Sequence, residues 1–226
     1  MPYRRRVPLK PILTARDEDG ESIPALVWRL PAPMRAISSA PLGGGIGIRH
    51  WVINATVPMS YSRNDPNVHL EDLAANFRLE NDGIGHLTGV DVAGNVHTTA
   101  ESADVWATVG LGQPIWAATR HQPPVPAQHR PGTINIVAFV PARLSDAALV
   151  NAVATITEAK AQALGDLGIP GTGTATDAVT VICPEDSRTA EEYGGPLSTW
   201  GSRLARATHE AVTTGGRLPQ IPWSER

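Results

Sequence analysis

The sequence has little cysteine and no long apolar run. Cys183 is the only cysteine among 226 residues, so no internal disulfide can form, and a reducing compartment is favoured. No apolar stretch approaches the ~20 residues that cross a bilayer. No apolar segment follows the basic residues Arg4 to Arg6, as one would in a signal peptide. We therefore expect a cytoplasmic protein with no membrane partner.

An excess of charge of either sign is also missing. The formal net charge is −3, charged residues make up 18%, and the sequence pI is about 6.2. This balance gives no electrostatic reason to expect a nucleic-acid partner. The 42% of hydrophobic residues excludes a chain that is disordered by its charge. A chain of this length buries roughly 70% of the surface that its unfolded form exposes, so we expect one domain with its own core.

Glycine and proline, by contrast, are abundant, with 21 and 20 residues, and they divide the chain into short elements. Apolar patterns predict strands at 23–30, 34–40, 49–57, 133–140 and 177–183, with three or four more between 85 and 118. The first two strands are predicted to form a hairpin. Helical spacing predicts helices at 69–79, 146–167 and 198–213.

These strands occur both in runs and in alternation with helices. The pattern favours an α/β fold, with α+β also possible, in which helices of a single domain pack against a mixed β-sheet. We expect an extended N-terminal segment belonging to the domain at residues 1–34, the body of the domain at 35–214 and a C-terminal tail at 215–226. The Pro-rich stretch 120–132 is typical of a surface loop.

Two glycine-rich stretches are candidate sites. Gly43, Gly44 and Gly45 lead into a predicted strand rather than a helix, which excludes the dinucleotide fingerprint. They form either a structural turn or a loop that faces a ligand. The stretch 171–177 carries three hydroxyls and the carboxylate of Asp177 directly before a buried strand. These groups could hold an amide carbonyl and move a proton, or Asp177 could bond its own turn.

The long predicted helix carries two candidate residues. Lys160 falls within the apolar stripe, eleven residues after Leu149, so its ammonium group either extends to solvent or is held by a carboxylate. Glu158 lies on the opposite, polar stripe, and the two side chains cannot readily meet. A catalytic Glu158 requires that this polar face line a pocket.

No motif for a metal or a nucleophile stands out. The seven histidines lack the spacing of a metal site, so we assign no metal ligand. Cys183 ends a predicted buried strand and is typical of a packed thiol. Ser38 and Ser39 lack the glycine-flanked elbow of many hydrolase serines.

Five stretches, taken in order, resemble one enzyme family. They are Ser38-Ser39-Ala40 with Gly43 to Gly45, Trp51-Val-Ile-Asn54, Gly132-Thr-Ile-Asn-Ile, Thr157-Glu158-Ala-Lys160-Ala-Gln-Ala-Leu164 and Gly173-Thr174-Ala-Thr176-Asp177-Ala. Over about residues 35–214 they resemble the adenosylcobinamide amidohydrolase family. The resemblance implies hydrolysis of the amide between aminopropanol and a corrinoid propionate, giving adenosylcobyric acid in corrinoid salvage. It implies no cofactor, since the cobalt belongs to the substrate.

The matching positions, together with His50 directly before the second stretch, provide the expected site. Catalysis is expected from the acid–base and donor groups Glu158, Asp177, Thr174, Lys160 and His50, with either carboxylate as the base and either Lys160 or His50 as the proton source. Substrate binding is expected from Ser38, Ser39, Gly43, Gly44, Gly45, His50, Asn54, Gly173 and Thr176. A corrinoid is the expected partner, and a homodimer is compatible with the sequence. Two alternatives stay open: a corrinoid- or tetrapyrrole-binding protein without catalysis, and an amidohydrolase for a different amide.

Overall fold

The computed structural model describes residues 9–18, 20–120, 132–186, 189–221 and 223. Its strands are β1 (Ile12–Glu18), β2 (Glu21–Ser38), β3 (Gly45–Thr56), β4 (Gly83–Thr88), β5 (Val96–Ala100), β6 (Ala103–Val109), β7 (Ile134–Phe139) and β8 (Ala178–Pro184). Its helices are α1 (Pro66–Asn76), α2 (Asp146–Asp166) and α3 (Thr199–Gly216), with a 3₁₀ turn at Val92–Gly94.

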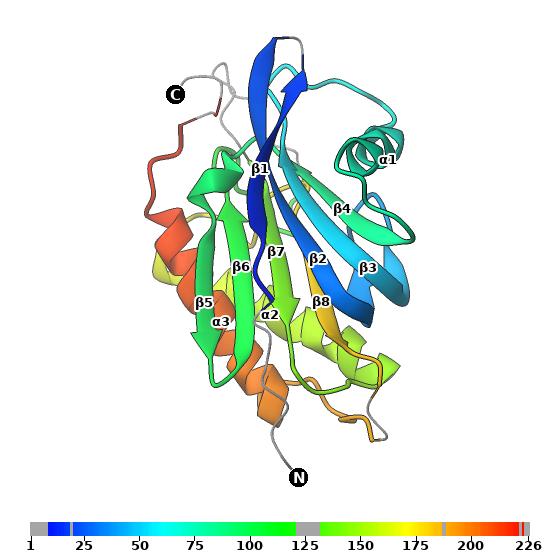
Figure 1. The fold of residues 1–226 in the computed structure, drawn as a ribbon. Helices are drawn as coiled ribbons and strands as arrows, with labels where there is room; N and C mark the ends of the chain where they lie inside the picture. The colour runs from blue at the N-terminus through cyan, green and yellow to red at the C-terminus, as the bar shows by residue number, and fades with distance from the viewer. Residues whose placement is uncertain (1–8, 19, 121–131, 187–188, 222, 224–226) are drawn as a thin grey trace.

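The eight strands form one mixed sheet in the order β4-β3-β2-β8-β7-β6-β5, and β1 pairs with β2 (Figure 1). The pairs β3–β4 and β7–β8 are parallel, whereas the other pairs are antiparallel. Helices α2 and α3 pack together against strands β5 to β8, and α1 packs against β2 and β3. The expected single domain with helices on a mixed sheet is confirmed.

The sheet curls strongly around its inner face, which is the face away from α2 and α3. The rings of Trp28 on β2 and Trp106 on β6 are 5.9 Å apart in an edge-to-face contact, although β8 and β7 lie between their strands. In a flat sheet the two strands would be about 14 Å apart, since neighbouring strands are separated by about 4.8 Å. Side chains of the sheet itself therefore fill the inner face.

The predicted hairpin of residues 23–30 and 34–40 is wrong, because both segments belong to the single strand β2. The register of β2 on β3 shifts between Arg29 and Met34, and the prolines that suggested a turn lie in this irregularity, where a strand tolerates them. The hairpin instead joins β1 to β2 through Gly20, whose φ is +81°. The predicted domain boundary at residue 35 falls inside β2.

Other predicted elements are confirmed. Strand 49–57 corresponds to most of β3 and ends one residue beyond it, and strands 133–140 and 177–183 correspond to β7 and β8. Ser145 caps α2 by accepting a hydrogen bond from the Ala148 amide, and Gly168 follows the helix with a φ of +71°. The Pro-rich stretch 120–132 lies almost wholly outside the described residues. In the described ranges, no helix is both long enough and apolar enough to cross a membrane.

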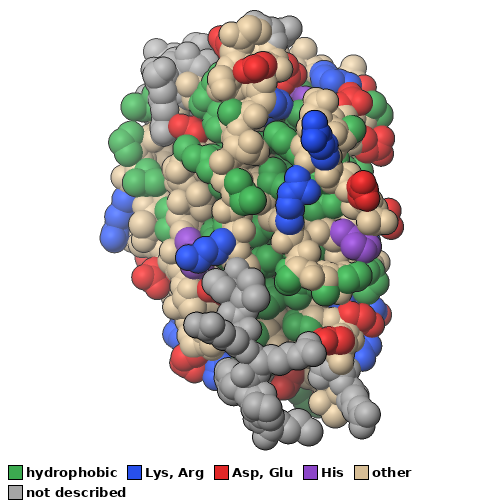
Figure 2. Space-filling model, viewed as in Figure 1, with side chains coloured by type: hydrophobic (Ala, Val, Ile, Leu, Met, Phe, Trp, Pro, Cys, Tyr) green, Lys and Arg blue, Asp and Glu red, His purple; other side chains and the backbone are tan. Residues whose placement is uncertain are grey.

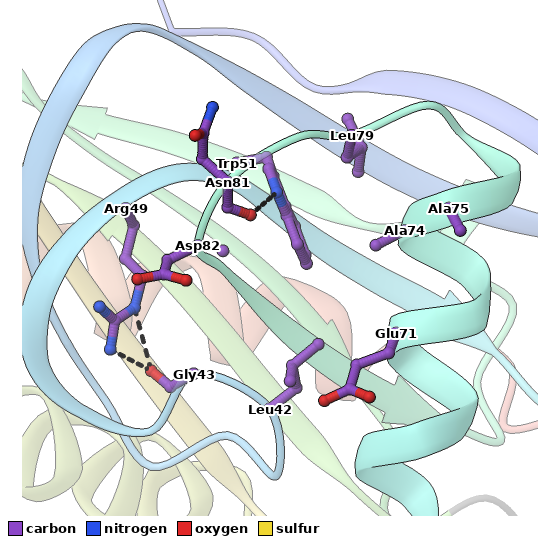
Figure 3. Close-up of a pocket in the computed structure, with 11 residues that line it drawn as sticks. Leu42, Gly43, Arg49, Trp51, Glu71, Ala74, Ala75, Leu79, Asn81 and Asp82 are labelled. Carbon is purple, nitrogen blue, oxygen red and sulfur yellow. Dashed lines mark hydrogen bonds between the residues drawn. The ribbon is translucent and has the colours of Figure 1, made fainter.

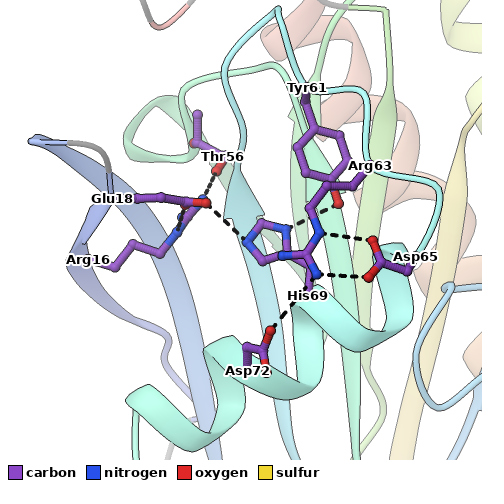
Figure 4. Close-up of polar contacts among 8 residues, drawn as sticks. All are labelled: Arg16, Glu18, Thr56, Tyr61, Arg63, Asp65, His69 and Asp72. Atoms are coloured by element: carbon purple, nitrogen blue, oxygen red, sulfur yellow. Dashed lines mark hydrogen bonds and ion pairs between the residues drawn. The ribbon is translucent and has the colours of Figure 1, made fainter.

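A polar cluster fastens the β1–β2 hairpin to α1 (Figure 4). His69 of α1 lies 3.1 Å from the Tyr61 hydroxyl and 3.5 Å from a carboxylate oxygen of Glu18 on β1. Arg16, also on β1, donates to Glu18 and to the Thr56 carbonyl. Burial lowers the pKa of His69 below its ordinary value. The N-terminal hairpin is thereby joined to the rest of the domain.

Candidate active site

Asp177 stands at the start of β8 and collects four hydrogen-bond donors. Lys160 of α2 and the Thr174 amide donate to Oδ2, while the Thr174 hydroxyl and the Ile134 amide of β7 donate to Oδ1. The side chains of Lys160 and Asp177 are only 7% and 10% exposed. The carboxylate therefore joins α2, β7 and its own loop, and the lone pairs that a general base would need are occupied.

The loop 171–177 is fixed on its outer side as well. The Ile115 amide donates to the Gly173 carbonyl at 2.8 Å, and the Thr172 amide donates to the Ile115 carbonyl at 2.9 Å. A Cβ atom on Gly173 would lie 2.5 Å from Lys160 Nζ. Only glycine therefore allows the loop to approach the ion pair this closely.

The end of β2 meets the start of β8 beside this loop. The Ser39 amide donates to the Val179 carbonyl, and the Val179 amide donates to the Ser39 hydroxyl, both at 3.0 Å. The Thr176 hydroxyl lies 2.6 Å from that of Thr133. Ser39 and Thr176 are exposed. The structure thus brings two predicted substrate-binding hydroxyl residues to the same end of the sheet.

Six polar side chains from six strands meet inside the curled sheet. They are Ser38 (β2), Asn54 (β3), His86 (β4), Thr108 (β6), Asn135 (β7) and Thr180 (β8), all at most 6% exposed. Asn54 donates to the Thr108 hydroxyl and accepts from the Asn135 amide group, at 3.1 and 3.0 Å. The Thr180 hydroxyl lies 2.8 Å from His86 Nε2 and 2.8 Å from the Ser38 hydroxyl. We call this set the polar layer.

His86 is the titratable member of the polar layer. Its side chain is fully buried, and burial lowers its pKa to about 4. Its Nδ1 atom has no hydrogen-bond partner among the described residues. The ring is therefore neutral at neutral pH, and within the described ranges Nε2 makes its one polar contact.

Gly43 and Gly44 lie in the bend before β3, Gly45 is the first residue of β3, and Gly43 borders an open cavity. Gly43 has a φ of +70°, and a Cβ atom there would lie 1.9 Å from the Gly83 carbonyl oxygen, so packing alone requires glycine. The cavity measures about 350 Å³ and is lined by Leu42, Gly43, Arg49, Trp51, Glu71, Ala74, Ala75, Leu79, Asn81, Asp82 and Gly83 (Figure 3). Packing explains the glycine at position 43, and the binding role predicted for Gly43, Gly44 and Gly45 stays a prediction.

The other predicted residues lie elsewhere. Glu158 is exposed on α2, and its position two residues before Lys160 turns it away from Asp177. His50 is half-buried on β3, with an Nδ1 atom that has no partner among the described residues. It precedes Asn54 by four residues, which separates the two Cα atoms by about 13 Å along the strand. The structure does not bring Glu158 or His50 to the Asp177 cluster.

Comparisons with known proteins place this fold in a family. The family model described as adenosylcobinamide amidohydrolase matches residues 10–220. The adenosylcobinamide amidohydrolase of Halobacterium salinarum is 34% identical over 194 residues, which cover 82% of this chain and 82% of that protein. The chain belongs to the adenosylcobinamide amidohydrolase family. The enzyme of that name from Methanosarcina mazei is 29% identical over 188 residues, covering 80% of this chain and 89% of its own.

The family match includes the N-terminal strands as well as the Asp177 cluster and the polar layer. The resemblance seen in the sequence is confirmed, and the match begins at residue 10 rather than 35.

The sequence analysis missed four members of the polar layer: His86, Thr108, Asn135 and Thr180. Strand alternation could have identified Asn135, because it shares a strand face with Val137 and Phe139 and is the polar residue of that set. In the part of the chain that is described, no three or more His, Cys, Asp or Glu side chains could together hold a metal ion.

Proposed function

We propose that this protein hydrolyses the amide that joins aminopropanol to a propionate side chain of adenosylcobinamide. Water enters, and adenosylcobyric acid and aminopropanol leave, in salvage of incomplete corrinoids. The observation that carries the proposal is the family match, which runs from residue 10 to residue 220. Two relatives that carry the name of this activity support it, because each aligns with at least 80% of the chain.

We place the reacting amide where the end of β2 meets the start of β8. The hydroxyl residues Ser39 and Thr176 are exposed there, and Ser38 of the polar layer is adjacent. Amide hydrolysis needs a nucleophile, a donor for the carbonyl oxygen and a proton for the leaving amine. Loop 171–177 and the serine pair provide hydroxyls for these roles, while Lys160 and Asp177 hold the loop from inside.

The proposed partner is a corrinoid, and the proposed reaction uses no cofactor besides the cobalt that the corrinoid carries. We propose no nucleic-acid partner, since the net charge is −3. On the face seen in Figure 2, basic and acidic side chains are interspersed, with hydrophobic side chains between them. Such a surface suits a small, largely uncharged ligand better than a polyanion.

The test is incubation of the purified protein with adenosylcobinamide, with chromatography for adenosylcobyric acid and aminopropanol. A visible-absorption titration of the same mixture reports binding separately. We expect both products in equal amounts, and binding before turnover. A spectral change without product selects a corrinoid-binding protein, whereas neither binding nor product contradicts the proposal and leaves an amidohydrolase for another amide to be tested.

A further inference from the structure

A continuous chain of hydrogen bonds links Ser38 to a buried histidine. The Ser38 hydroxyl accepts from the Ala40 amide at 3.0 Å and contacts the Thr180 hydroxyl at 2.8 Å. The Thr180 hydroxyl contacts His86 Nε2 at 2.8 Å. When the ring proton of His86 is on Nδ1, the Ser38 hydroxyl donates to Thr180 and the Thr180 hydroxyl donates to Nε2. The Ser38 oxygen then keeps one free lone pair, and the Ser38 proton has an acceptor in Thr180.

The other candidate nucleophiles and bases suit those roles less well. Asp177 already accepts four donors, and Thr174 donates its hydroxyl to Asp177. Cys183 is buried, which raises the pKa of its thiol, and its sulfur accepts from the Leu144 amide. Glu158 lies on the outer face of α2. Ser38 is 6% exposed and directly precedes the exposed Ser39 at the end of β2, so it lies at the end of the sheet where we place the amide.

Resting on the function proposed above, we propose that Ser38 is the catalytic nucleophile, with Thr180 and His86 as the relay that takes its proton. Ser38 Oγ forms a bond to the amide carbonyl carbon. The Ser38 proton moves to Thr180 as the Thr180 proton moves to His86 Nε2. The C–N bond then breaks as His86 Nε2 returns its proton to Thr180 and the Thr180 hydroxyl gives its own proton to the amine nitrogen, so that aminopropanol leaves and the corrinoid stays on Ser38 as an ester. Water cleaves the ester, which releases adenosylcobyric acid and restores the serine hydroxyl.

The surroundings of Ser38, Thr180 and His86 fit this sequence of steps. The Ala40 amide donates to Ser38 Oγ, so it also stabilises negative charge that develops there during attack and release. Thr180 and His86 are fully buried, so water does not compete for the proton. The neutral ring of His86 can accept the proton at neutral pH, and because burial lowers its pKa to about 4, the ring is a weak base that returns the proton readily.

The first experiment uses hydroxylamine to intercept the ester. Wild-type protein is given adenosylcobinamide, or its analogue with ethanolamine in place of aminopropanol, in the presence of hydroxylamine. A shared ester predicts that the corrinoid hydroxamate and the corrinoid acid form in the same ratio from both amides. Absence of the hydroxamate, or a ratio that depends on the leaving amine, overturns the proposal.

The second experiment compares variants by turnover, corrinoid binding and Tm. We expect Ser38→Ala to lower kcat by about 10³-fold, and Thr180→Val and His86→Gln by about 10²-fold each, with binding retained. Thr98→Val is the matched control, because it also removes a buried hydroxyl bond, the one from Thr98 to the Ala207 carbonyl. It should keep turnover.

The outcomes separate this assignment from the proposed function. A folded Ser38→Ala variant within about 10-fold of wild type overturns the nucleophile assignment and leaves the amidohydrolase function standing. If the wild-type protein forms neither the acid nor the hydroxamate from adenosylcobinamide, the proposed function fails and the assignment fails with it. The hydroxylamine ratio needs no variant, so it decides the question even if Ser38→Ala does not fold.

Discussion

At the scale of the residue, the ion pair of Lys160 and Asp177 has the largest energetic consequence in the site. Both side chains are at most 10% exposed. A buried ion pair adds little stability relative to apolar residues of the same size, yet removal of one partner leaves a buried charge that costs about 3–5 kcal/mol. The ion pair therefore serves to fix the loop 171–177 in place, and we expect its loss to lower both stability and turnover.

Asp177→Asn tests this role of the ion pair. The amide cannot balance the Lys160 charge, so the free energy of unfolding should fall by about 3 kcal/mol, and turnover should fall as the loop loosens. Adding Lys160→Met to the same chain removes the uncompensated charge and should recover part of the stability. Urea unfolding and turnover of the single and double variants check both expectations.

Glu158→Gln is the matched control for that experiment. Its carboxylate is exposed on α2, so the substitution should leave both the unfolding free energy and the turnover close to wild type. A loss of turnover beyond about 10²-fold would instead give Glu158 the acid–base role that its place in the family stretch suggests.

Cys183→Ala should keep most of the turnover and lose some stability. The thiol is fully buried on β8, and burial raises its pKa, so it is poorly suited to act as a thiolate nucleophile. Removing the sulfur leaves a small cavity that costs about 1–2 kcal/mol. Thermal denaturation with a turnover assay checks this, and a folded but inactive variant would contradict it.

Single residues were predictable from the sequence to different degrees. Lys160 stood out because a charge in an apolar stripe must either pair with an opposite charge or extend to solvent, and the structure identifies Asp177 as its partner. The pairing itself was not predictable, since it depends on where the loop before β8 lies against α2. His86 gave no signal, because a histidine between two strand residues is equally compatible with either face of a sheet.

At the scale of the element, the helices and single strands followed from local patterns. The Ser145 cap and Gly168 set the ends of α2, and both signals are local in sequence. Strand β2 was split in two by the prediction because Pro31 and Pro33 normally interrupt a strand. The first half of β2 pairs with β1 and the second half pairs with β8, and this pairing keeps the two halves in one strand. The pairing with β8 joins residues that are far apart in the sequence, so local patterns do not reveal it.

The entry into β3 offers a comparison between two glycines. Gly43→Ala would place a Cβ 1.9 Å from the Gly83 carbonyl oxygen at a φ of +70°, whereas Gly45 has a φ of +83° with nothing within 4 Å. We expect Gly45→Ala to cost only the strain of its φ, about 1–2 kcal/mol, and Gly43→Ala to cost about 3 kcal/mol or more because it also overpacks. Denaturant unfolding measures both, and equal losses would contradict the role given to the Gly83 contact.

At the scale of the whole molecule, dialysis against EDTA tests the proposal that no metal besides the corrinoid cobalt takes part. The described residues offer no cluster of three metal-ligating side chains. Turnover of adenosylcobinamide should therefore survive EDTA unchanged. Loss of activity that is restored by added zinc would contradict the metal-free reaction.

The curl of the sheet is the feature that local sequence patterns could not predict. Alternation assigns each strand residue to one of two faces, but it does not state how far the sheet bends. The bend brings His86 of β4 to Thr180 of β8, across β3 and β2. The polar layer is thus a property of the whole fold, and only the family resemblance pointed to some of its members in advance.

The same curl makes stability depend on pH through His86. Its pKa is about 4 in the folded protein, against an ordinary value of 6.5. The unfolded chain therefore binds a proton first, and stability is lost as the pH falls from 6.5 toward 4, by about 3 kcal/mol in total. Above pH 6.5 His86 contributes no pH dependence. His69, whose pKa is also lowered by burial, acts in the same direction.

Unfolding in urea at pH 7.0, 5.5 and 4.5 measures this dependence, and His86→Gln isolates the share of one residue. Carboxylates and His69 titrate in both proteins, so their contributions cancel in the difference. We expect the unfolding free energy of wild type to fall more steeply with acid than that of the variant, and the two curves to approach each other at low pH. Parallel curves would mean that His86 already takes up its proton in the folded protein, and that the polar layer opens to water without global unfolding.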